Sequence, residues 1–252
     1  MHSVSGGGRS DAKREESRRR RGVMLLPNLI TTGALFSGFY AIVAAMNGHF
    51  VAAGIAIFAA LLLDAADGRV ARLTQSESEF GAQYDSLSDM VAFGVAPALV
   101  AFSWALSSLG QIGWVVTFIY MACAALRLAR FNVQGDHASF TGLASPSAAA
   151  IVAGTVWIWS EATTGSPGVI TASVMGAITA LMGLLMVSNF RYYSPKSINF
   201  KGRVPFVTLV AVVLGFAVVL ADPPRVLLVL FAAYAVSGPL QYAWQRMRHS
   251  ED

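Results

Sequence analysis

The chain has 252 residues, of which 55% are apolar and only 13% are charged, and its formal net charge is +4. This composition excludes an ordinary soluble enzyme and is typical of a protein that spans a membrane several times. The single cysteine, Cys123, excludes an internal disulfide framework and a cysteine-based zinc site.

The first segment of the chain, residues 1–24, is rich in glycine and serine and then in arginine, so we expect a disordered basic tail. Residues 18–21 are four consecutive arginines, close to the first apolar run. Beside a membrane helix, such a cluster more commonly sets orientation and contacts anionic lipids than binds nucleic acid. We therefore expect membrane lipids, and no nucleic acid, as partners.

Eight apolar blocks follow the tail, most of them close to the roughly 20 residues that a helix needs to cross a bilayer. They lie near residues 28–47, 50–73, 82–107, 112–131, 146–163, 168–190, 204–221 and 225–244. The blocks lack the alternation of membrane strands, so the expected fold is all-α. We predict a polytopic bundle of about eight transmembrane helices.

The distribution of basic residues predicts the orientation. Threading eight spans from the tail places every lysine and arginine except Arg225 on the side of the tail. By the positive-inside rule that side is cytoplasmic, so we expect a multi-pass protein of the cell (inner) membrane with both termini inside.

Four aspartates interrupt the second and third blocks: Asp64, Asp67, Asp85 and Asp89. Their spacings of three and four residues place each pair on one face of a helix. The polar turn between the two helices places both pairs near the cytoplasmic surface. A charged aspartate at a helix centre costs roughly 2.5 to 3.5 kcal/mol on insertion scales, so something must compensate.

A divalent cation compensates most directly, because carboxylate oxygens suit Mg²⁺ or Mn²⁺. Four carboxylates suit two ions about 3.5 to 4 Å apart, an arrangement that supports displacement at phosphorus. Gly68, Ala71 and Gly81 would let a bulky anion approach the backbone, and Arg72 would add a phosphate contact. The alternatives are structural aspartates paired with Arg69 or Arg72, and the ion path of a carboxylate-lined cation transporter.

The pattern Asp64-x2-Asp67-Gly68-x2-Ala71-Arg72-x8-Gly81-x3-Asp85-x3-Asp89 resembles the signature of the CDP-alcohol phosphotransferase family, over roughly residues 24–200. The resemblance implies a six-helix membrane core, usually a homodimer, that moves a phosphatidyl or similar group from a CDP-linked donor to an alcohol. It implies that the four aspartates bind two divalent ions. It further implies catalysis by Asp85 and Asp89, with Asp89 as general base, and contacts from Gly68, Arg72 and Gly81 to CDP.

This resemblance divides the chain into the tail (1–24), the catalytic core (25–203), two additional C-terminal helices (204–245) and a short cytoplasmic tail (246–252). Other stretches are similar to the phosphatidylserine synthase branch, which uses CDP-diacylglycerol and serine. They are PNLIT at 27–31, RLARFN at 127–132, FTGLASPSA at 140–148 and NFRYYSPKS at 189–197. The branch usually has proline where Ala144 stands, and proline would fix φ in that loop.

A serine acceptor needs a cation for its carboxylate and oxygen atoms for its ammonium group. We expect Arg130 to supply the cation, and Asn132 and Ser145 to orient polar atoms. Arg127 is either a ligand or a side chain that only snorkels to lipid headgroups. Asn28 and Thr31 are expected near the nucleotide, with helix capping as the alternative for Asn28.

Another acceptor remains an alternative within the family: glycerol phosphate, inositol phosphate or choline. A phosphorylated acceptor would need more cations than Arg127 and Arg130 supply, and Lys196, Lys201 or Arg203 would have to provide them. Lys196 and Lys201 could also contact the donor phosphate or lipid headgroups.

Overall fold

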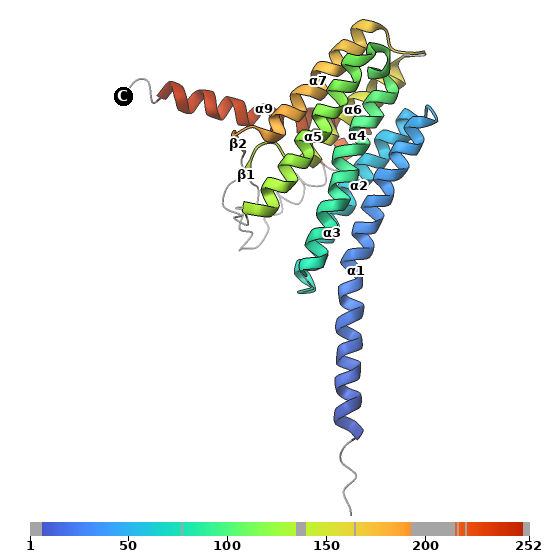
Figure 1. Cartoon of the computed structure of the whole chain (residues 1–252), viewed down its shortest axis with the longest axis vertical. Helices are drawn as coiled ribbons and strands as arrows, with labels where there is room; N and C mark the ends of the chain where they lie inside the picture. Colours follow the sequence, from blue (N-terminus) through green and yellow to red (C-terminus); the bar gives the residue numbers. More distant parts are fainter. Residues whose placement is uncertain are drawn as a thin grey trace, which may run out of the picture.

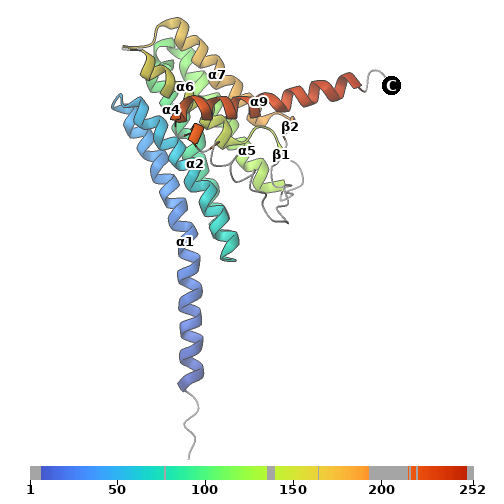
Figure 2. The same cartoon turned by 180° about the vertical axis from the view of Figure 1, so that it is seen from behind.

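A computed structural model describes residues 7–76, 78–134, 140–163, 165–192, 215, 217–219 and 221–248. Within these ranges the chain is almost entirely helical (Figures 1 and 2). In chain order the elements are α1 (Gly7–Met46), α2 (Phe50–Leu73), α3 (Glu79–Asp89), the π-helical turn η1 (Met90–Val95), α4 (Ala96–Trp104), the 3₁₀ turn η2 (Leu106–Leu109), α5 (Gln111–Gln134), β1 (Phe140–Thr141), α6 (Ser145–Ala162), α7 (Val169–Val187), β2 (Arg191–Tyr192) and α9 (Pro223–Arg248).

Six of the described helical segments are long and apolar enough to cross a membrane: Leu25–Met46, Phe50–Leu73, Glu79–Trp104, Gln111–Val133, Val169–Val187 and Pro223–Tyr242. The third of these combines α3, η1 and α4. α6 lies inside the bundle, with residues 147–156 buried. The all-α, polytopic fold is thereby confirmed. The predicted block at 204–221 falls almost entirely outside the described residues, so the count of eight spans stays a prediction.

The N-terminal segment differs from the expected disordered tail, because α1 is helical from Gly7 onward. Alanine, lysine, arginine and glutamate favour helix, and Glu15 and Glu16 precede arginines at spacings of three and four residues. In Figure 1 this first part of α1 projects well beyond the bundle.

Small residues let the helices approach closely. Buried alanines make up much of the core, among them Ala41, Ala53, Ala60 and Ala92. A Cβ added to Gly38 on α1 would lie 2.7 Å from the Ala92 Cα, so the backbones of α1 and η1 almost touch. Close backbone approach of this kind is typical of helix packing in membranes.

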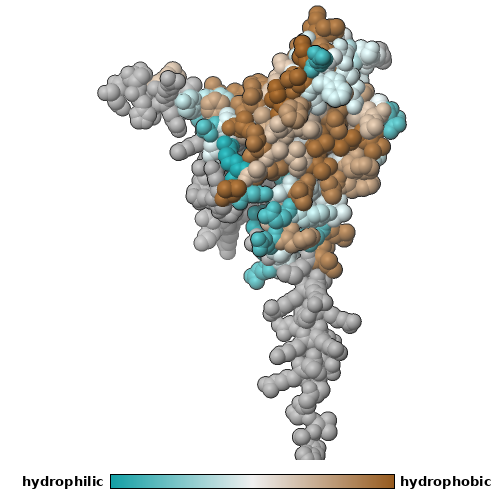
Figure 3. Space-filling view, viewed as in Figure 1, coloured by the Kyte–Doolittle hydropathy of each residue, from teal (hydrophilic) through white to brown (hydrophobic). Residues whose placement is uncertain are grey.

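The outer surface of the bundle is apolar, as its place in a bilayer requires. Leu62, Trp114 and Ile170 are each at least 70% exposed. Figure 3 shows apolar residues covering most of one face, with hydrophilic residues gathered toward the end from which α1 projects. This polar end holds the turn between α2 and α3.

The C-terminal helix α9 forms where a last span was predicted at 225–244, but its direction differs from that expectation. It packs on α6 and β2. Figures 1 and 2 show that it crosses the bundle at a steep angle and that its C-terminal half projects sideways. The antiparallel pair β1–β2, which the sequence did not suggest, joins Phe140 to Tyr192 and Thr141 to Arg191 beneath it.

Candidate active site

The site is built where α2 ends and α3 begins. The chain leaves α2 through Gln75, which has a positive φ of 52°. Ser78 then caps α3, because its hydroxyl oxygen accepts a hydrogen bond from the Gly81 N–H at 3.0 Å. A serine at this position satisfies one of the free N–H groups at the start of a helix. The short turn brings the end of α2 beside the start of α3.

The predicted aspartates gather across this turn. Asp64 and Asp67 on α2 and Asp85 on α3 each offer a carboxylate oxygen, and these oxygens all lie within 4.8 Å of one another. Asp67 is buried, and the other two are half-buried. Asp89, one turn after Asp85, lies close to Asp64, although it is not among the three carboxylates within 4.8 Å of one another. The structure thus places the four carboxyl groups in one cluster.

Helix α1 supports the cluster through Thr31, which is buried. The Thr31 hydroxyl lies 2.7 Å from a carboxylate oxygen of Asp67 and 3.0 Å from the Pro27 carbonyl oxygen. A hydroxyl has one hydrogen to donate, and a charged carboxylate is a stronger acceptor than a carbonyl oxygen. The Thr31 hydroxyl therefore donates to Asp67. The Ser88 hydroxyl donates to the Thr31 carbonyl at 3.2 Å and so ties α3 to α1.

Neither Arg69 nor Arg72, the two arginines of α2, forms an ion pair with the aspartates, whereas Arg127 on α5 lies near Asp89. Among the residues whose side chains the structure describes, one side-chain ion pair forms, between Arg225 and Asp222, far from the aspartates in sequence. No described arginine therefore forms the pair with Asp64 or Asp67 that the structural alternative required. Clustered carboxylates in a membrane protein need compensation, and oxygen donors at this spacing fit Mg²⁺ or Mn²⁺.

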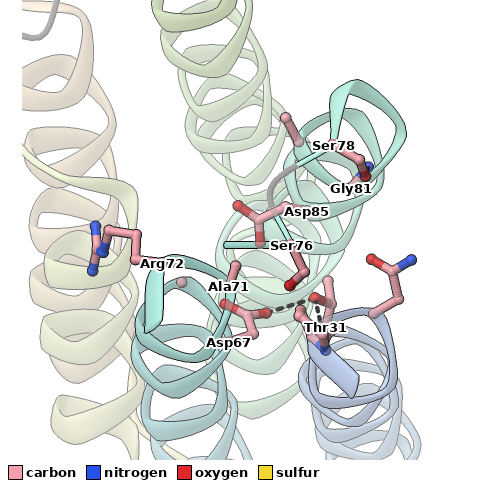
Figure 4. Close-up of a pocket in the computed structure, with 12 residues that line it drawn as sticks. Thr31, Asp67, Ala71, Arg72, Ser76, Ser78, Gly81 and Asp85 are labelled. Atoms are coloured by element: carbon pink, nitrogen blue, oxygen red, sulfur yellow. Dashed lines mark hydrogen bonds between the residues drawn. The ribbon is translucent and has the colours of Figure 1, made fainter. Parts of the chain in front are cut away.

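A cavity of about 350 Å³ opens beside the carboxylates. Its walls come from the start of the membrane part of α1, the end of α2 and the start of α3: Pro27, Asn28, Thr31, Asp67, Gly68, Ala71, Arg72, Ser76, Ser78, Gly81, Ala82 and Asp85. Figure 4 shows the Asp67 and Asp85 side chains projecting into the same space. A cavity of this size lies in the range of small-ligand pockets, about 300 to 1,000 Å³.

The residues predicted to contact CDP all line this cavity, but their surroundings differ. A Cβ added to Gly68 would have no protein atom within 4 Å, so the absent side chain leaves room for something outside the protein. A Cβ at Gly81 would lie 3.1 Å from the Ser78 hydroxyl oxygen and 3.4 Å from the Asn28 Oδ1. Arg72 is exposed, and Figure 4 shows its guanidinium group turned away from Asp67 and Asp85.

Arg127 proves to be the buried cation of the site. It is only 9% exposed, so it does not snorkel to lipid headgroups. Its Nη1 donates to the Ser145 hydroxyl at 2.6 Å, and it interacts electrostatically with Asp89. Its Nε is buried without a hydrogen-bond partner among the described residues. A buried guanidinium with an unpaired N–H is a position that an acidic ligand can complete.

Arg130, the predicted ligand for serine, is instead engaged with the backbone. Its Nη2 donates to the carbonyl oxygens of Thr141 at 2.6 Å and Met186 at 3.4 Å, and its Nη1 donates to that of Val187 at 3.5 Å. A Cβ at Gly142, where φ is +85°, would lie 2.3 Å from the Met186 carbonyl oxygen. These contacts fasten the loop before α6 to the end of α7, and they engage both Nη atoms of Arg130. The role of Arg130 as the ligand of serine stays a prediction.

The other two predicted acceptor residues lie near Arg127 or the start of α3. Ser145 is fully buried at the start of α6, directly after Ala144. The φ of Ala144 is −62°, which is the value that proline would impose, so the departure from the family pattern leaves the backbone unchanged. Asn132 is exposed, and its Oδ1 accepts a hydrogen bond from Ser86 at 3.2 Å.

Sequence reasoning missed the cap at Ser78 and left Arg127 undecided. The Ser78-x-x-Gly81 spacing at the start of a helix could have indicated the cap. The role of Arg127 depends on which face of α5 meets α3, which the local sequence does not contain. Lys196, Lys201 and Arg203 lie outside the described residues.

Comparison with known proteins matches the same part of the chain. The sequence model of the CDP-alcohol phosphatidyltransferase family matches residues 24–186, which include the four aspartates, Arg127 and Ser145. A protein of Helicobacter pylori is 35% identical over 221 residues, or 86% of this chain and 91% of the relative. One of Methanocaldococcus jannaschii is 37% identical over 190 residues, or 74% and 82%. One of Mycobacterium tuberculosis is 42% identical over 147 residues, or 54% and 51%. Each of these relatives is named CDP-diacylglycerol–serine O-phosphatidyltransferase.

Proposed function

The chain belongs to the CDP-alcohol phosphatidyltransferase family, and we propose that it transfers the phosphatidyl group of CDP-diacylglycerol to the hydroxyl group of L-serine. The products are phosphatidylserine and CMP. The observation that carries this proposal is the cluster of Asp64, Asp67 and Asp85 at the wall of a cavity beside Gly68. The names of the relatives support serine as the acceptor.

The four aspartates would hold two divalent cations, Mg²⁺ or Mn²⁺. When bound, such ions neutralise a pyrophosphate and stabilise charge on the attacking and leaving oxygens. The donor set supports this assignment, because it consists of carboxylate oxygens without a cysteine or histidine among them. The Thr31 hydroxyl orients Asp67 for this role.

The protein's own groups bind the donor and handle the proton. Asn28, Gly68 and Gly81 line the space for the CDP moiety, and Arg72 could swing its long side chain onto a phosphate. Asp89 accepts the proton of the serine hydroxyl as its oxygen bonds to the phosphatidyl phosphorus. The bond from that phosphorus to the CMP oxygen then breaks, and CMP leaves with the bonding electrons.

We assign Arg127 as the residue that binds the carboxylate group of serine, with Ser145 and Asn132 as polar neighbours of the bound serine. Arg127 is buried beside Asp89 and has an unpaired Nε, so it can hold an acidic group close to the base. A bound carboxylate would satisfy that N–H and gain a charge-assisted hydrogen bond. An acceptor without an acidic group would leave it unsatisfied.

The distribution of lysine and arginine supports an orientation in the cell membrane with the site and both termini on the cytoplasmic side. Serine and CMP are water-soluble, whereas both lipids stay in the bilayer, and a site at the end of the bundle suits this division. We further propose a homodimer, and a catalytic core of residues 25–203 followed by two additional C-terminal helices.

A direct assay tests this function. Purified protein in detergent is given CDP-diacylglycerol, Mn²⁺ or Mg²⁺, and one labelled alcohol from a panel of serine, glycerol 3-phosphate, inositol phosphate and choline. We expect label to enter the lipid fraction from serine alone, with loss of activity in EDTA and recovery on adding Mn²⁺. Incorporation of another alcohol would transfer the proposal to that acceptor. Cation flux in liposomes without any lipid product would replace it with the transporter.

A further inference from the structure

The third span does not continue as a regular α-helix beyond Asp89, the proposed base. The π-helical turn η1 follows at Met90–Val95, and α4 continues from Ala96. A π-helical turn contains one more residue than an α-helical turn would at the same place, and such turns are rare. Because this turn follows Asp89 directly, it sets the direction in which Asp85 and Asp89 point relative to α4.

Proline accounts for this turn. In an α-helix the Phe93 carbonyl would accept a hydrogen bond from the residue four positions later, which is Pro97. Proline has no N–H, and its ring clashes with the carbonyl four residues before it. The Phe93 carbonyl therefore loses its helical donor in a segment where Phe93 itself is fully buried.

Tyr120 on α5 supplies the missing donor. Its hydroxyl donates to the Phe93 carbonyl oxygen at 3.1 Å. Tyr120 is fully buried, and a Cβ at Gly183 on α7 would lie 3.1 Å from the Tyr120 Cα. Helix α7 thus holds the tyrosine against η1, while Ala124, one turn further along α5, packs against Gly94.

The same face of α5 leads to the site. Arg127 lies seven residues after Tyr120, which is about two helical turns, so both side chains leave α5 on one face. Phe93 and Asp89 are likewise four residues apart on the third span. Helix α5 and the third span are therefore joined at two positions. One is the hydrogen bond from Tyr120 to Phe93, and the other is the interaction of Arg127 with Asp89.

We propose that Tyr120 is a positioning residue for the carboxylates: its hydrogen bond to the Phe93 carbonyl stabilises the π-helical turn made by Pro97, and this turn aims Asp85 and Asp89 at Asp64 and Asp67. The proposal rests on the metal-binding role given to the aspartates above. Without the extra residue of the π turn, Asp85 and Asp89 would rotate by about 100° relative to α4, the angle of one residue in an α-helix.

The test is Mn²⁺ binding by purified protein with CDP-diacylglycerol and no serine, measured by the electron paramagnetic resonance signal of free Mn²⁺. No turnover to phosphatidylserine occurs under these conditions, so binding is measured apart from transfer. The variants are Tyr120→Phe and the double variant Tyr120→Phe with Pro97→Ala, in which the new backbone N–H at position 97 can bond to the Phe93 carbonyl. Thermal unfolding, followed by tryptophan fluorescence, is measured on each.

Tyr192→Phe is the matched control. Its hydroxyl also donates to a backbone carbonyl of another helix, that of Ala235 on α9, at 3.0 Å. The control loses the same kind of bond but leaves the third span unchanged, so it should unfold at a lower temperature and bind Mn²⁺ as the wild type does.

We expect Tyr120→Phe to unfold at a lower temperature and to bind Mn²⁺ about tenfold more weakly, as loss of support around metal ligands commonly does. In the double variant the unfolding temperature should return toward that of the wild type while Mn²⁺ binding stays weak. Wild-type binding in either variant would overturn the proposal. If Tyr120→Phe fails to fold, the double variant decides alone. A wild-type protein that binds no Mn²⁺ would instead contradict the proposed function.

Discussion

At the scale of single residues, the four aspartates differ in their surroundings. Thr31 engages Asp67 through a hydrogen bond, whereas Asp89 lies between Asp64 and the guanidinium group of Arg127. Asp89 is therefore the carboxylate closest to the proposed position of the acceptor. This placement supports its assignment as the base and leaves the other three chiefly as metal ligands.

Replacing Asp89 by asparagine should lower kcat about 10²- to 10⁴-fold, the usual contribution of a general base. The amide keeps the size of the side chain, so the protein should stay folded and inserted. Asp222→Asn is the control, because it removes an exposed carboxylate whose partner is Arg225. Transfer to serine is measured for both, and an Asp89→Asn protein that retains more than half of the activity would exclude Asp89 as the base.

Gly68→Ala separates ligand binding from folding. A methyl group there meets no protein atom within 4 Å, and alanine favours a helix over glycine by about 1 kcal/mol, so the protein should not be destabilised. If CDP fills the adjacent space, the methyl group should raise the KM for CDP-diacylglycerol about tenfold, equivalent to about 1.4 kcal/mol.

Gly168→Ala provides the comparison for this change. Gly168 also has no atom within 4 Å of an added Cβ, but it lies between α6 and α7, outside the cavity. Its KM should equal that of the wild type. An unchanged KM in Gly68→Ala as well would show that the donor does not occupy this cavity.

At the scale of elements, two arginines one turn apart on α5 perform separate tasks. Arg130 holds the carbonyl ends of β1 and α7, whereas Arg127 points to Asp89 and Ser145. The sequence predicted that this turn of α5 is functional, but it assigned the acceptor to Arg130 and left the role of Arg127 open. Their difference arises from Thr141, in the described part of the connection before α6, and from the end of α7, whose carbonyl oxygens accept from Arg130.

Arg130→Met should destabilise the protein by about 1.5 to 3 kcal/mol, the range for hydrogen bonds to a charged group, because carbonyl oxygens lose their donor. The KM for serine should change little in the protein that remains folded. Arg127→Met should raise the KM for serine more than it lowers the unfolding temperature. Thermal unfolding and serine titration together distinguish the two variants, and the reverse pattern would restore Arg130 as the acceptor ligand.

The element boundaries show which parts of the fold the local sequence determines. The block predicted at 50–73 is α2, and those at 112–131 and 168–190 correspond closely to α5 and α7, because an apolar run bounded by polar turns fixes a membrane helix locally. The π turn was not predicted, since it depends on Pro97 and on Tyr120 from another helix. The steep direction of α9 was not predicted either, because hydropathy gives no direction.

At the scale of the whole molecule, the charge distribution predicts that the two ends of the bundle face different compartments. The active site lies at the end of the bundle that holds the α2–α3 turn, and the α6–α7 turn lies at the opposite end. The positive-inside rule assigns the first of these to the cytoplasm. The location of the four aspartates near one end, rather than at the centre, agrees with water-soluble serine and CMP as substrate and product.

Single cysteines introduced into a Cys123→Ala protein test this orientation. Gln75→Cys lies in the exposed α2–α3 turn and Ser166→Cys in the exposed α6–α7 turn. In intact cells a membrane-impermeant maleimide should label position 166 and should reach position 75 only after permeabilisation. Labelling of position 75 in intact cells would reverse the proposed orientation.

The proposed function requires the aspartate cluster to hold divalent cations against the donor pyrophosphate. Anomalous diffraction from crystals grown with Mn²⁺ and CDP-diacylglycerol tests it most directly. We expect anomalous peaks among the carboxylates of Asp64, Asp67, Asp85 and Asp89, within coordinating distance of their oxygens. Donor density in the cavity with no anomalous signal among these carboxylates would contradict it.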